Sequence, residues 1–461
     1  MHRYLLLLNE LESLIESGQW KDGEKLPSIR TLADRYACSN STIIRALAEL
    51  EHRHMIYSVP KSGYYVVKSA YAPSLKPSGV INFAASSPDP DIFPYLDFQH
   101  CINKAIDTYR NDLFIYGTPQ GLPSLIQVIQ KQFRDYQVFT QPSRIFITSG
   151  VQQALAILAA IPFPNQKTKV VIEQPSYHLL IEYLETHQIP AIGIERTARG
   201  IDWDELERIF RCENVKFFYT MPRFHSPLGT SYTKQEKLAL LELARKYDVY
   251  IVEDDHMADF EEDSKADPLF AYDQSARVIY LKSYAKILLP GLRVGVAVIP
   301  EELSRAFTQY KRLMDIDTSM FSQAALEIYI KSGMFERHRH KIRSCYAKRS
   351  RLLAASIQQH FGHRFPGIVS ACEVKQPMIH THIMLNERIS LSPIITRLKK
   401  DGVLLEPIEK HYLKHFPKRN LLKLNVSNVK ETDIETGIAK LADAIGDSLE
   451  RSGLRISYGM S

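Results

Sequence analysis

Residues 283–295 read SYAKILLPGLRVG and follow the apolar run VIYL at 278–281, which predicts a buried strand leading into a loop. In this loop Lys286 is an amine that can bond to an aldehyde carbon when its surroundings lower its pKa. Ser283 and Arg293 are donors that suit a phosphate, and the arginine can donate two parallel hydrogen bonds. S-x-x-K alone is a weak signal. With P-G-x-R-x-G behind it, the stretch predicts a site for a cofactor that carries an aldehyde and a phosphate.

A second predicted strand, upstream, ends in acidic side chains. Residues 249–252 read VYIV, as a buried parallel strand does, and Glu253, Asp254 and Asp255 follow. Asp254 is the candidate to pair with a protonated ring nitrogen, which keeps the cofactor ring an electron sink. A solvated acidic loop is the alternative interpretation, because EED follows at 261–263.

A third stretch, residues 145–155, reads IFITSGVQQAL and predicts a strand, a glycine turn and a helix. Such a turn directs backbone N–H groups and a helix N-terminus toward an anion. It has neither a Walker lysine nor G-x-G-x-x-G, which excludes a nucleotide loop. The candidates for holding the phosphate are Ser149, Gly150, Val151 and Gln152.

Two tyrosines are candidates for cofactor contacts because of their positions in the chain. Tyr177 ends the run EQPSY, where it can stack on the cofactor ring, and Tyr116 begins YGTPQG, ahead of the first long predicted helix. Taken singly, each is more often a packed aromatic residue. Their positions in the chain order, relative to the three stretches above, favour a role for both in the cofactor site.

The order of these elements resembles that of the fold-type-I aminotransferases, and the resemblance covers residues 80–461. It implies an α/β domain of the fold-type-I PLP-dependent aminotransferase class, with pyridoxal 5'-phosphate joined to Lys286 as a Schiff base. In those enzymes the tyrosine at the position of Tyr116 reaches the phosphate of the neighbouring subunit. The resemblance therefore implies a homodimer with shared cofactor sites.

Four positions depart from the aminotransferase pattern. Ser226 replaces the asparagine that binds the phenolic oxygen of the cofactor, and His256 replaces the tyrosine on the same oxygen; both remain candidates for cofactor contacts. Ala285 stands where a second phosphate-binding serine is common. Lys423, the candidate for the carboxylate of a substrate or effector, replaces an arginine and lacks its two-pronged geometry. We expect cofactor binding with weak or no transaminase turnover.

Residues 1–68 differ from the rest of the chain in their predicted secondary structure, which consists of three short helices followed by two strands. Ser28 and Ser39 are the N-cap candidates of the second and third helices, and the strands are IYSV at 56–59 and YYVV at 64–67. This layout is a winged helix-turn-helix. The face expected to be buried in the first helix consists of Leu5, Leu8, Leu11, Leu14 and Ile15.

The candidates for DNA contacts follow from that geometry, since the start of the third helix can enter a major groove. We expect Arg45 and the polar turn at the start of this helix to contact base edges. We expect Arg30 and Lys61 to bind phosphates, and Gly63 to let the wing lie close to the DNA backbone. A small helical module for protein contacts is the alternative. The polar turn consists of Ser39, Asn40, Ser41 and Thr42.

The runs GEKLPSIRTLA at 23–33 and STIIRAL at 41–47 resemble the signature of the GntR-type winged-helix regulators, which bind operator DNA as dimers. A winged helix ahead of an aminotransferase-like domain resembles the MocR subfamily of those regulators. Residues 69–79, rich in serine and proline, are predicted to be a linker.

Several kinds of protein are excluded by composition. Five scattered cysteines without a C-x-x-C pair predict a reducing compartment, with neither a disulfide framework nor a zinc site. No apolar run reaches the roughly 18 residues of a membrane span, and the N-terminus lacks the core of a signal peptide. The sequence thus predicts a cytoplasmic protein with no membrane contact.

Two further patterns are given less weight. The histidine pairs 411/415 and 380/382 have ligand-like spacing but no third ligand, so no metal site is expected. The run RHRHKIR at 337–343 predicts a solvated basic helix face, with a second DNA contact as the alternative.

Together these features predict a transcriptional regulator that binds operator DNA and senses pyridoxal phosphate, alone or joined to an amine or amino-acid effector. One alternative is an active PLP-dependent aminotransferase with an appended winged helix; another is a degenerate scaffold that binds no cofactor. Lys286 and Asp254 argue against the scaffold, whereas Lys423 and Ser226 argue against the enzyme.

Overall fold

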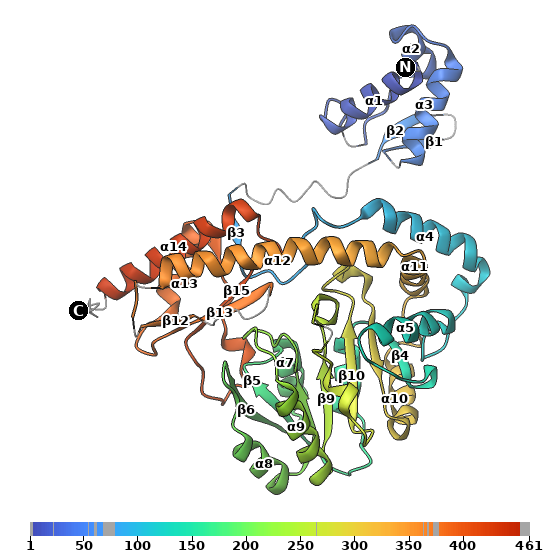
Figure 1. Ribbon diagram of the computed structural model, residues 1–461. Helices are drawn as coiled ribbons and strands as arrows, with labels where there is room; N and C mark the ends of the chain where they lie inside the picture. The colour runs from blue at the N-terminus through green and yellow to red at the C-terminus, as the bar shows by residue number, and fades with distance from the viewer. Residues whose placement is uncertain are drawn as a thin grey trace. The chain divides into compact units, whose positions relative to one another are not determined.

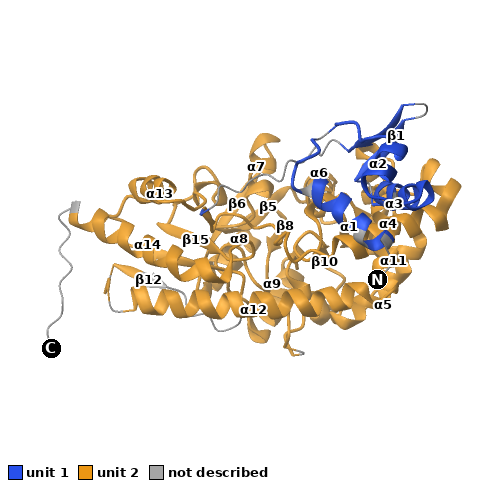
Figure 2. Ribbon diagram, turned by 90° about the horizontal axis from the view of Figure 1, so that it is seen from above, with its two compact units in different colours: residues 1–79 blue, residues 80–461 orange. Residues whose placement is uncertain are grey.

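The computed structural model describes residues 3–451 apart from 22, 54, 60–61, 68–78, 264, 363, 367 and 372–377. The chain divides into two compact units, residues 1–79 and 80–461, which are coloured separately in Figure 2. Figure 1 labels the helices and strands of both.

The first unit packs three helices against a two-stranded antiparallel sheet. The side chains of Ser28 and Ser39 accept hydrogen bonds from the N–H groups of Thr31 and Thr42, so both predicted N-caps are present. The aliphatic side chains of these elements enclose one small core. The elements are α1 (Arg3–Glu16), α2 (Ile29–Arg35), α3 (Asn40–His52), β1 (Ile56–Val59) and β2 (Gly63–Val66).

The buried face of α1 differs from the predicted one. Leu5 is 45% exposed, whereas Leu7, Leu8 and Leu11 are buried. At 3.6 residues per turn the three buried leucines share one stripe, and Leu5 lies about 100° away from its centre. Since residues 5–8 are all leucine, the sequence offered no polar contrast from which to choose the face.

The second unit is built on an eight-stranded sheet in the order β4-β11-β10-β9-β8-β5-β6-β7. Its middle strands are parallel; β11 runs antiparallel to β10 and β4, and β7 antiparallel to β6. The buried strands predicted before Asp254 and before the Lys286 loop are both present. The strands are β4 (Ile145–Thr148), β5 (Lys169–Gln174), β6 (Ala191–Thr197), β7 (Gly200–Ile201), β8 (Val215–Thr220), β9 (Tyr250–Asp254), β10 (Val278–Ser283) and β11 (Gly295–Val298).

Helices cover both faces of this sheet, which is why its central strands are apolar on both sides. In β10, Ile279 and Leu281 pack toward α6, α7 and α10, while Val278 and Tyr280 pack on the opposite face with α5, α8, α9 and α11. This arrangement confirms the predicted α/β class. The helices are α4 (Tyr95–Tyr109), α5 (Pro123–Asp135), α6 (Val151–Ala160), α7 (His178–Thr186), α8 (Trp203–Cys212), α9 (Lys234–Lys246), α10 (Glu301–Met314) and α11 (Met320–Lys331).

The C-terminal part of the second unit forms a smaller layer with its own core. Helices α12 (Met334–Phe361), α13 (Leu391–Lys400) and α14 (Glu431–Arg451) pack with a three-stranded antiparallel sheet. The start of the unit joins this layer, because β3 pairs with β14 in parallel. The strands are β3 (Ile81–Asn82), β12 (Val369–Ala371), β13 (His380–Leu385), β14 (Val403–Leu404) and β15 (Leu421–Asn425). Short 3-10 turns are η1 (Arg110–Phe114), η2 (Pro142–Arg144), η3 (Ala258–Phe260), η4 (Leu269–Tyr272), η5 (Pro290–Leu292) and η6 (Glu409–His411).

The basic run at 337–343 is not a fully solvated face of α12. His338 is buried, with Nε2 2.8 Å from the carbonyl oxygen of Ile287. Arg343 donates to the carbonyl oxygens of Asp259 and Glu261 at 2.5 and 2.7 Å. His338 and Arg343 therefore fasten α12 to the neighbouring loops.

Candidate functional site

A cavity of about 960 Å³, partly open to solvent, lies at the carboxyl ends of β5, β8, β9 and β10. Ligands of α/β folds commonly bind at this edge, where the loops after parallel strands converge. The predicted cofactor residues that line the cavity are Gly150, Val151, Gln152, Tyr177, Ser226, Asp254, His256, Ser283, Lys286 and Arg293, together with Lys423.

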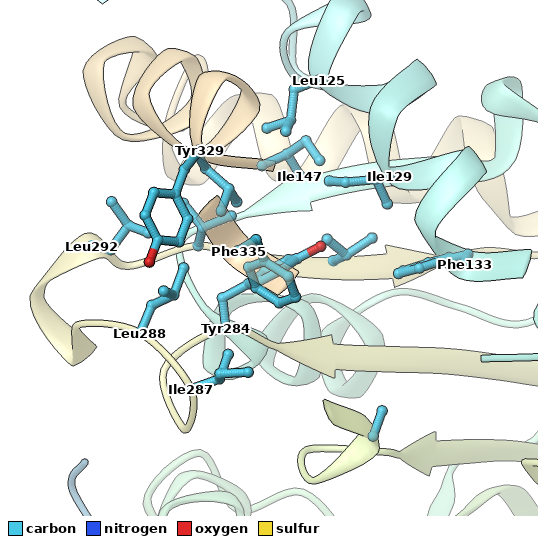
Figure 3. Packing of buried hydrophobic residues seen from close by; sticks show 14 of the residues in the cluster. Leu125, Ile129, Phe133, Ile147, Tyr284, Ile287, Leu288, Leu292, Tyr329 and Phe335 are labelled. Carbon is cyan, nitrogen blue, oxygen red and sulfur yellow. The ribbon is translucent and has the colours of Figure 1, made fainter. Parts of the chain in front are cut away.

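The loop at 283–295 is held by four buried apolar side chains that do not line the cavity. Figure 3 shows Tyr284, Ile287, Leu288 and Leu292 packed among side chains of α5, β4 and α11. The hydroxyl of Tyr284 also donates to Gln132 Oε1 at 2.6 Å. This burial fixes the loop with its polar members on the cavity side.

Lys286 is the nucleophile candidate. Its Nζ donates to the carbonyl oxygen of Ser86 at 2.9 Å. Burial, helped by the positive charge of Lys423, lowers the pKa of Lys286 to about 8. A neutral amine is therefore available near physiological pH, which bonding to a carbonyl carbon requires.

Asp254 is the one of the three consecutive acids that lines the cavity. Glu253 accepts from the backbone N–H groups of Leu269 and Phe270, and Asp255 pairs with Arg223. All three carboxylates are buried, which overturns the alternative of a solvated acidic loop.

The two carboxylate oxygens of Asp254 differ in their hydrogen bonding. Oδ2 accepts from the Tyr219 hydroxyl at 2.7 Å, while Oδ1 is buried without a hydrogen-bond partner among the described residues. Burial raises the pKa of Asp254 to about 6. A buried acceptor of this kind suits the protonated nitrogen of a pyridine ring.

The turn before α6 and Arg293 form an anion cup. Gly150 has φ +79°, and a Cβ there would lie 2.9 Å from Arg293 Nη2. A Cβ on Gly295 would lie 2.7 Å from the backbone of Gly150. Both positions thus need glycine so that the guanidinium and the start of α6 can converge, as a phosphate requires.

Within this turn, Ser149 departs from its predicted role as a side-chain ligand. Its hydroxyl donates to Asp315 Oδ2 at 2.9 Å, and it does not line the cavity. Its carbonyl oxygen and Gln152 Oε1 instead accept from Arg293 Nη2 at 2.9 and 3.0 Å. Ser149 therefore orients the arginine.

Tyr177, Ser226 and His256 all line the same cavity, as predicted. Burial and the nearby charge of Lys286 lower the pKa of His256 to about 3. His256 is therefore neutral across the physiological range.

Lys423 reaches the cavity from β15 and is already paired. Its Nζ donates to Glu406 Oε2 and to Ser86 Oγ, both at 3.2 Å, and its side chain is 5% exposed. This carboxylate partner, Glu406, was not predicted from the sequence.

Several cavity residues were missed because they come from distant segments. Ser86 follows β3, and Asn425 lies on β15, which pairs with β13. No motif marks these two positions, since strand pairing brings them to the cavity. His178 was missed although it directly follows Tyr177, and His380 on β13 was considered only for metal binding. His411, considered only for metal binding, also lines the cavity.

Tyr116 lies outside the cavity and is 77% exposed. The amide N–H of its neighbour Gly117 donates to Asp317 Oδ2 at 2.7 Å. Within one chain, therefore, Tyr116 contributes nothing to the cavity.

In the first unit, the polar turn at the start of α3 is organised by its cap. Ser39 Oγ lies 2.8 Å from Ser41 Oγ and 2.9 Å from Thr42 Oγ1. Asn40 is exposed between these capping groups. Of this turn, Asn40 is the side chain best placed to reach a groove.

The remaining predicted DNA contacts are distributed around the same unit. Arg30 and Arg45 are exposed, and the guanidinium carbon of Arg45 lies 4.7 Å from the centre of the Tyr4 ring. Gly63 begins β2 with φ +121°. Lys61 lies outside the described residues.

Two further findings concern the described residues only. They contain no group of three or more His, Cys, Asp or Glu side chains arranged to hold a metal ion. None of their helices combines the length and apolarity needed to cross a bilayer.

Known proteins resemble both units. The family of aminotransferases of class I and II matches residues 78–441, and the gntR family of bacterial regulatory proteins matches residues 4–66. The uncharacterized HTH-type transcriptional regulator YcxD of Bacillus subtilis is 57% identical over 441 residues, covering 96% of this chain and 99% of the relative. The aromatic-amino-acid aminotransferase 1 of Thermococcus litoralis is 27% identical over 81% of this chain and 90% of the relative.

A solved structure of the kynurenine aminotransferase of Pyrococcus horikoshii superposes on 81% of this chain and 92% of that chain, with a TM-score of 0.73 and 29% identity. The family match supports pyridoxal phosphate as the cofactor, as predicted from the sequence. The chain therefore belongs to the aminotransferase class I and II family and, with its gntR-type domain, has the architecture of the MocR-type transcriptional regulators.

Proposed function

We propose that this regulator binds operator DNA through residues 1–68 and that pyridoxal phosphate, alone or joined to an amine effector, controls that binding in the cytoplasm. The observation that supports it most is one cavity holding Lys286, a buried Asp254 oxygen without a partner, and the anion cup at Gly150 and Arg293. When bound, pyridoxal phosphate supplies an aldehyde that bonds to amines and a ring that withdraws electrons.

Each residue then has a defined task. Lys286 would hold the cofactor through its aldehyde, and Asp254 Oδ1 would accept a hydrogen bond from the protonated ring nitrogen. Arg293 and the N–H groups at the start of α6 would bind the phosphate. Tyr177 would contact the ring, and Ser226 and His256 its phenolic oxygen.

The competing function is an active aminotransferase with an appended winged helix. Efficient transamination needs a substrate held in a reactive geometry, usually through its α-carboxylate. Here Lys423 stands at that position and is already bound to Glu406, and Ser226 is shorter than the asparagine it replaces. These contacts favour a sensor over an enzyme.

A homodimer is part of the proposal. Large apolar side chains are exposed on α4, on the segment that includes Tyr116, and at the end of α10. Burying them against a second copy would also bring Tyr116 to the partner's phosphate cup. They include Leu96, Phe114, Ile115 and Leu313.

One paired measurement tests the function. Operator affinity is titrated with and without pyridoxal phosphate, and keto-acid formation from common amino acids is assayed on the same preparation. We expect the cofactor to change operator affinity and the turnover to be very slow. Rapid multiple turnover, with operator affinity indifferent to the cofactor, would instead identify an enzyme.

A further inference from the structure

The contact between Lys423 and Glu406 has consequences for the ligand. Lys423 lines the cavity, and it is the side chain that the sequence assigned to the carboxylate of an effector. Its ammonium group is held at 3.2 Å by Glu406 Oε2 and at 3.2 Å by Ser86 Oγ. A carboxylate from within the chain thus occupies the charge that an α-amino acid would need.

Glu406 is firmly ionised in this position. Burial alone would raise its pKa, but the neighbouring His411 and Lys410 side chains and the charge of Lys423 hold the pKa well below its ordinary value. Lys410 forms an ion pair with it, and His411 Nε2 lies 3.7 Å away. Glu406 therefore stays charged, and its partners fix it beside Lys423.

The other basic groups on the cavity wall are committed or neutral, apart from His411, whose Nε2 lies beside Glu406. The proposed function assigns Lys286 to the aldehyde and Arg293 to the phosphate. Burial lowers the pKa of His178 to about 4 and that of His256 to about 3, and it holds the pKa of His380 well below its ordinary value. Among the described lining residues, none of these groups offers a spare positive charge to a carboxylate.

A ligand carboxylate at Lys423 would face one of two penalties. Displacing Glu406 leaves a partly buried carboxylate with fewer partners, and sharing the ammonium places two carboxylates side by side. An amine with an uncharged tail meets neither penalty. Discrimination by a built-in repulsive group is a general device of selective sites.

We infer that the effector site selects primary amines that carry no carboxylate on the amine-bearing carbon, with Glu406 as the specificity-determining residue. The inference rests on the proposed function, because the amine is expected to join the cofactor at Lys286. Glu406 acts through Lys423, so it is a positioning residue.

The test uses the full-length protein loaded with pyridoxal phosphate, titrated by absorbance with matched pairs of ligands. Suitable pairs are L-alanine with ethylamine, L-leucine with 3-methylbutylamine, and L-phenylalanine with 2-phenylethylamine, compared at equal concentrations of unprotonated amine. We expect each amine to shift the spectrum at a concentration at least tenfold lower than its amino acid.

Two variants and one control separate specificity from general damage. Glu406→Gln frees Lys423, and we expect it to raise amino-acid affinity at least tenfold while amine affinity changes less than threefold. Lys423→Gln removes the ammonium group but keeps the Glu406 carboxylate, so the preference for amines over amino acids should persist in it; this ratio remains informative if the first variant does not fold. Glu409→Gln, at an exposed position on η6, should match the unmodified protein in both series.

The outcomes divide cleanly between the two proposals. Amino acids that bind more tightly than their amines, or a ratio unmoved by Glu406→Gln, would overturn the specificity inference and leave the regulator function standing. A protein that shows no cofactor absorbance before any ligand is added would overturn the proposed function, and the inference with it.

Discussion

Lys286 combines burial with a hydrogen bond that directs its amine, and both properties belong to a group that reacts with aldehydes. We expect borohydride to reduce the bond between lysine nitrogen and cofactor carbon, leaving the cofactor permanently attached at this residue. Peptide mass mapping locates the attachment. Lys286→Ala should abolish it, whereas Lys265→Ala, at an exposed lysine, should not. Attachment at a different lysine would refute the assignment.

Ionisation of Asp254 opposes folding when no cofactor is bound. Burial is the main cause that raises its pKa from 3.8 to about 6. The ionised form is thus less favourable in the folded than in the unfolded chain. The free energy of unfolding therefore falls as pH rises from about 4 to about 6 and stays lower above that range. This difference in pKa between the folded and the unfolded chain lowers the free energy of unfolding by about 3 kcal/mol at most.

Asp254→Asn removes this charge and can keep the hydrogen bond from Tyr219. We expect it to raise the free energy of unfolding of the cofactor-free protein by about 1–3 kcal/mol at pH 8 and by much less at pH 4.5. Denaturant titrations at the two pH values measure the difference. The same variant should bind the cofactor more weakly, because an amide carries no charge to offset the ring proton. A gain equal at both pH values would show that charge burial is not the cause.

Single residues were predictable where spacing within one segment carries the chemistry. Lys286, Arg293 and Asp254 reach the cavity as expected, because each sits at the end of a strongly apolar strand or on the loop after it. Ser86 and Glu406 were not predictable, since the pairing of β3 with β14 and the fold of the segment after β14 bring them to Lys423. Contacts of that range leave no local pattern in the sequence.

At the scale of one helix, α3 separates a structural serine from a residue suited to reading DNA. Ser39 spends its hydroxyl on the N-cap, whereas Asn40 is exposed beside it. We expect Ser39→Ala to lower the free energy of unfolding of the first unit by about 1 kcal/mol and to weaken binding to all DNA sequences alike. Asn40→Ala should leave thermal stability unchanged and relax sequence preference.

Arg45 and Arg30 give a matched comparison on neighbouring helices. Arg45→Ala is expected to cost about 1–3 kcal/mol on the preferred operator and less on other sequences. Arg30→Ala should weaken binding evenly and lower the salt slope by about one. Binding titrations on operator and scrambled DNA at several salt concentrations decide this; identical profiles for both variants would contradict the groove assignment.

Elements whose sequence contrasts clearly with their surroundings in apolar and polar residues were predicted well. Elements without that contrast were not. Strands β9 and β10 each begin with an unbroken apolar run, residues 250–252 and 278–281, because helices cover both sheet faces, so their positions stood out. The leucine run of α1 and the basic run of α12 lack contrast between faces. Tertiary packing decided which of their side chains turned inward, and that information is not local.

At the scale of the whole molecule, the exposed apolar side chains predict association. Phe114 is 86% exposed two residues before Tyr116. Phe114→Asp should shift the protein from dimer toward monomer in sedimentation experiments, because it places a charge within an apolar contact. Phe139→Asp, at another exposed aromatic residue, is the control. A monomer that keeps full cofactor affinity would show that the partner's tyrosine is not needed.

Regulation requires that cofactor binding and DNA binding be thermodynamically coupled. Reciprocity is strict: if the cofactor changes operator affinity by some factor, the operator must change cofactor affinity by the same factor, typically corresponding to 1–3 kcal/mol. We expect equal factors from operator titrations at saturating cofactor and from cofactor titrations, followed by absorbance, at saturating operator. Lys286→Ala should bring both factors close to one while keeping the operator affinity of the cofactor-free protein. Slow turnover suits this role, because the occupied state must persist while the protein searches for its site. A cofactor that binds Lys286 fully yet leaves both factors at one would assign the second unit a task separate from DNA binding.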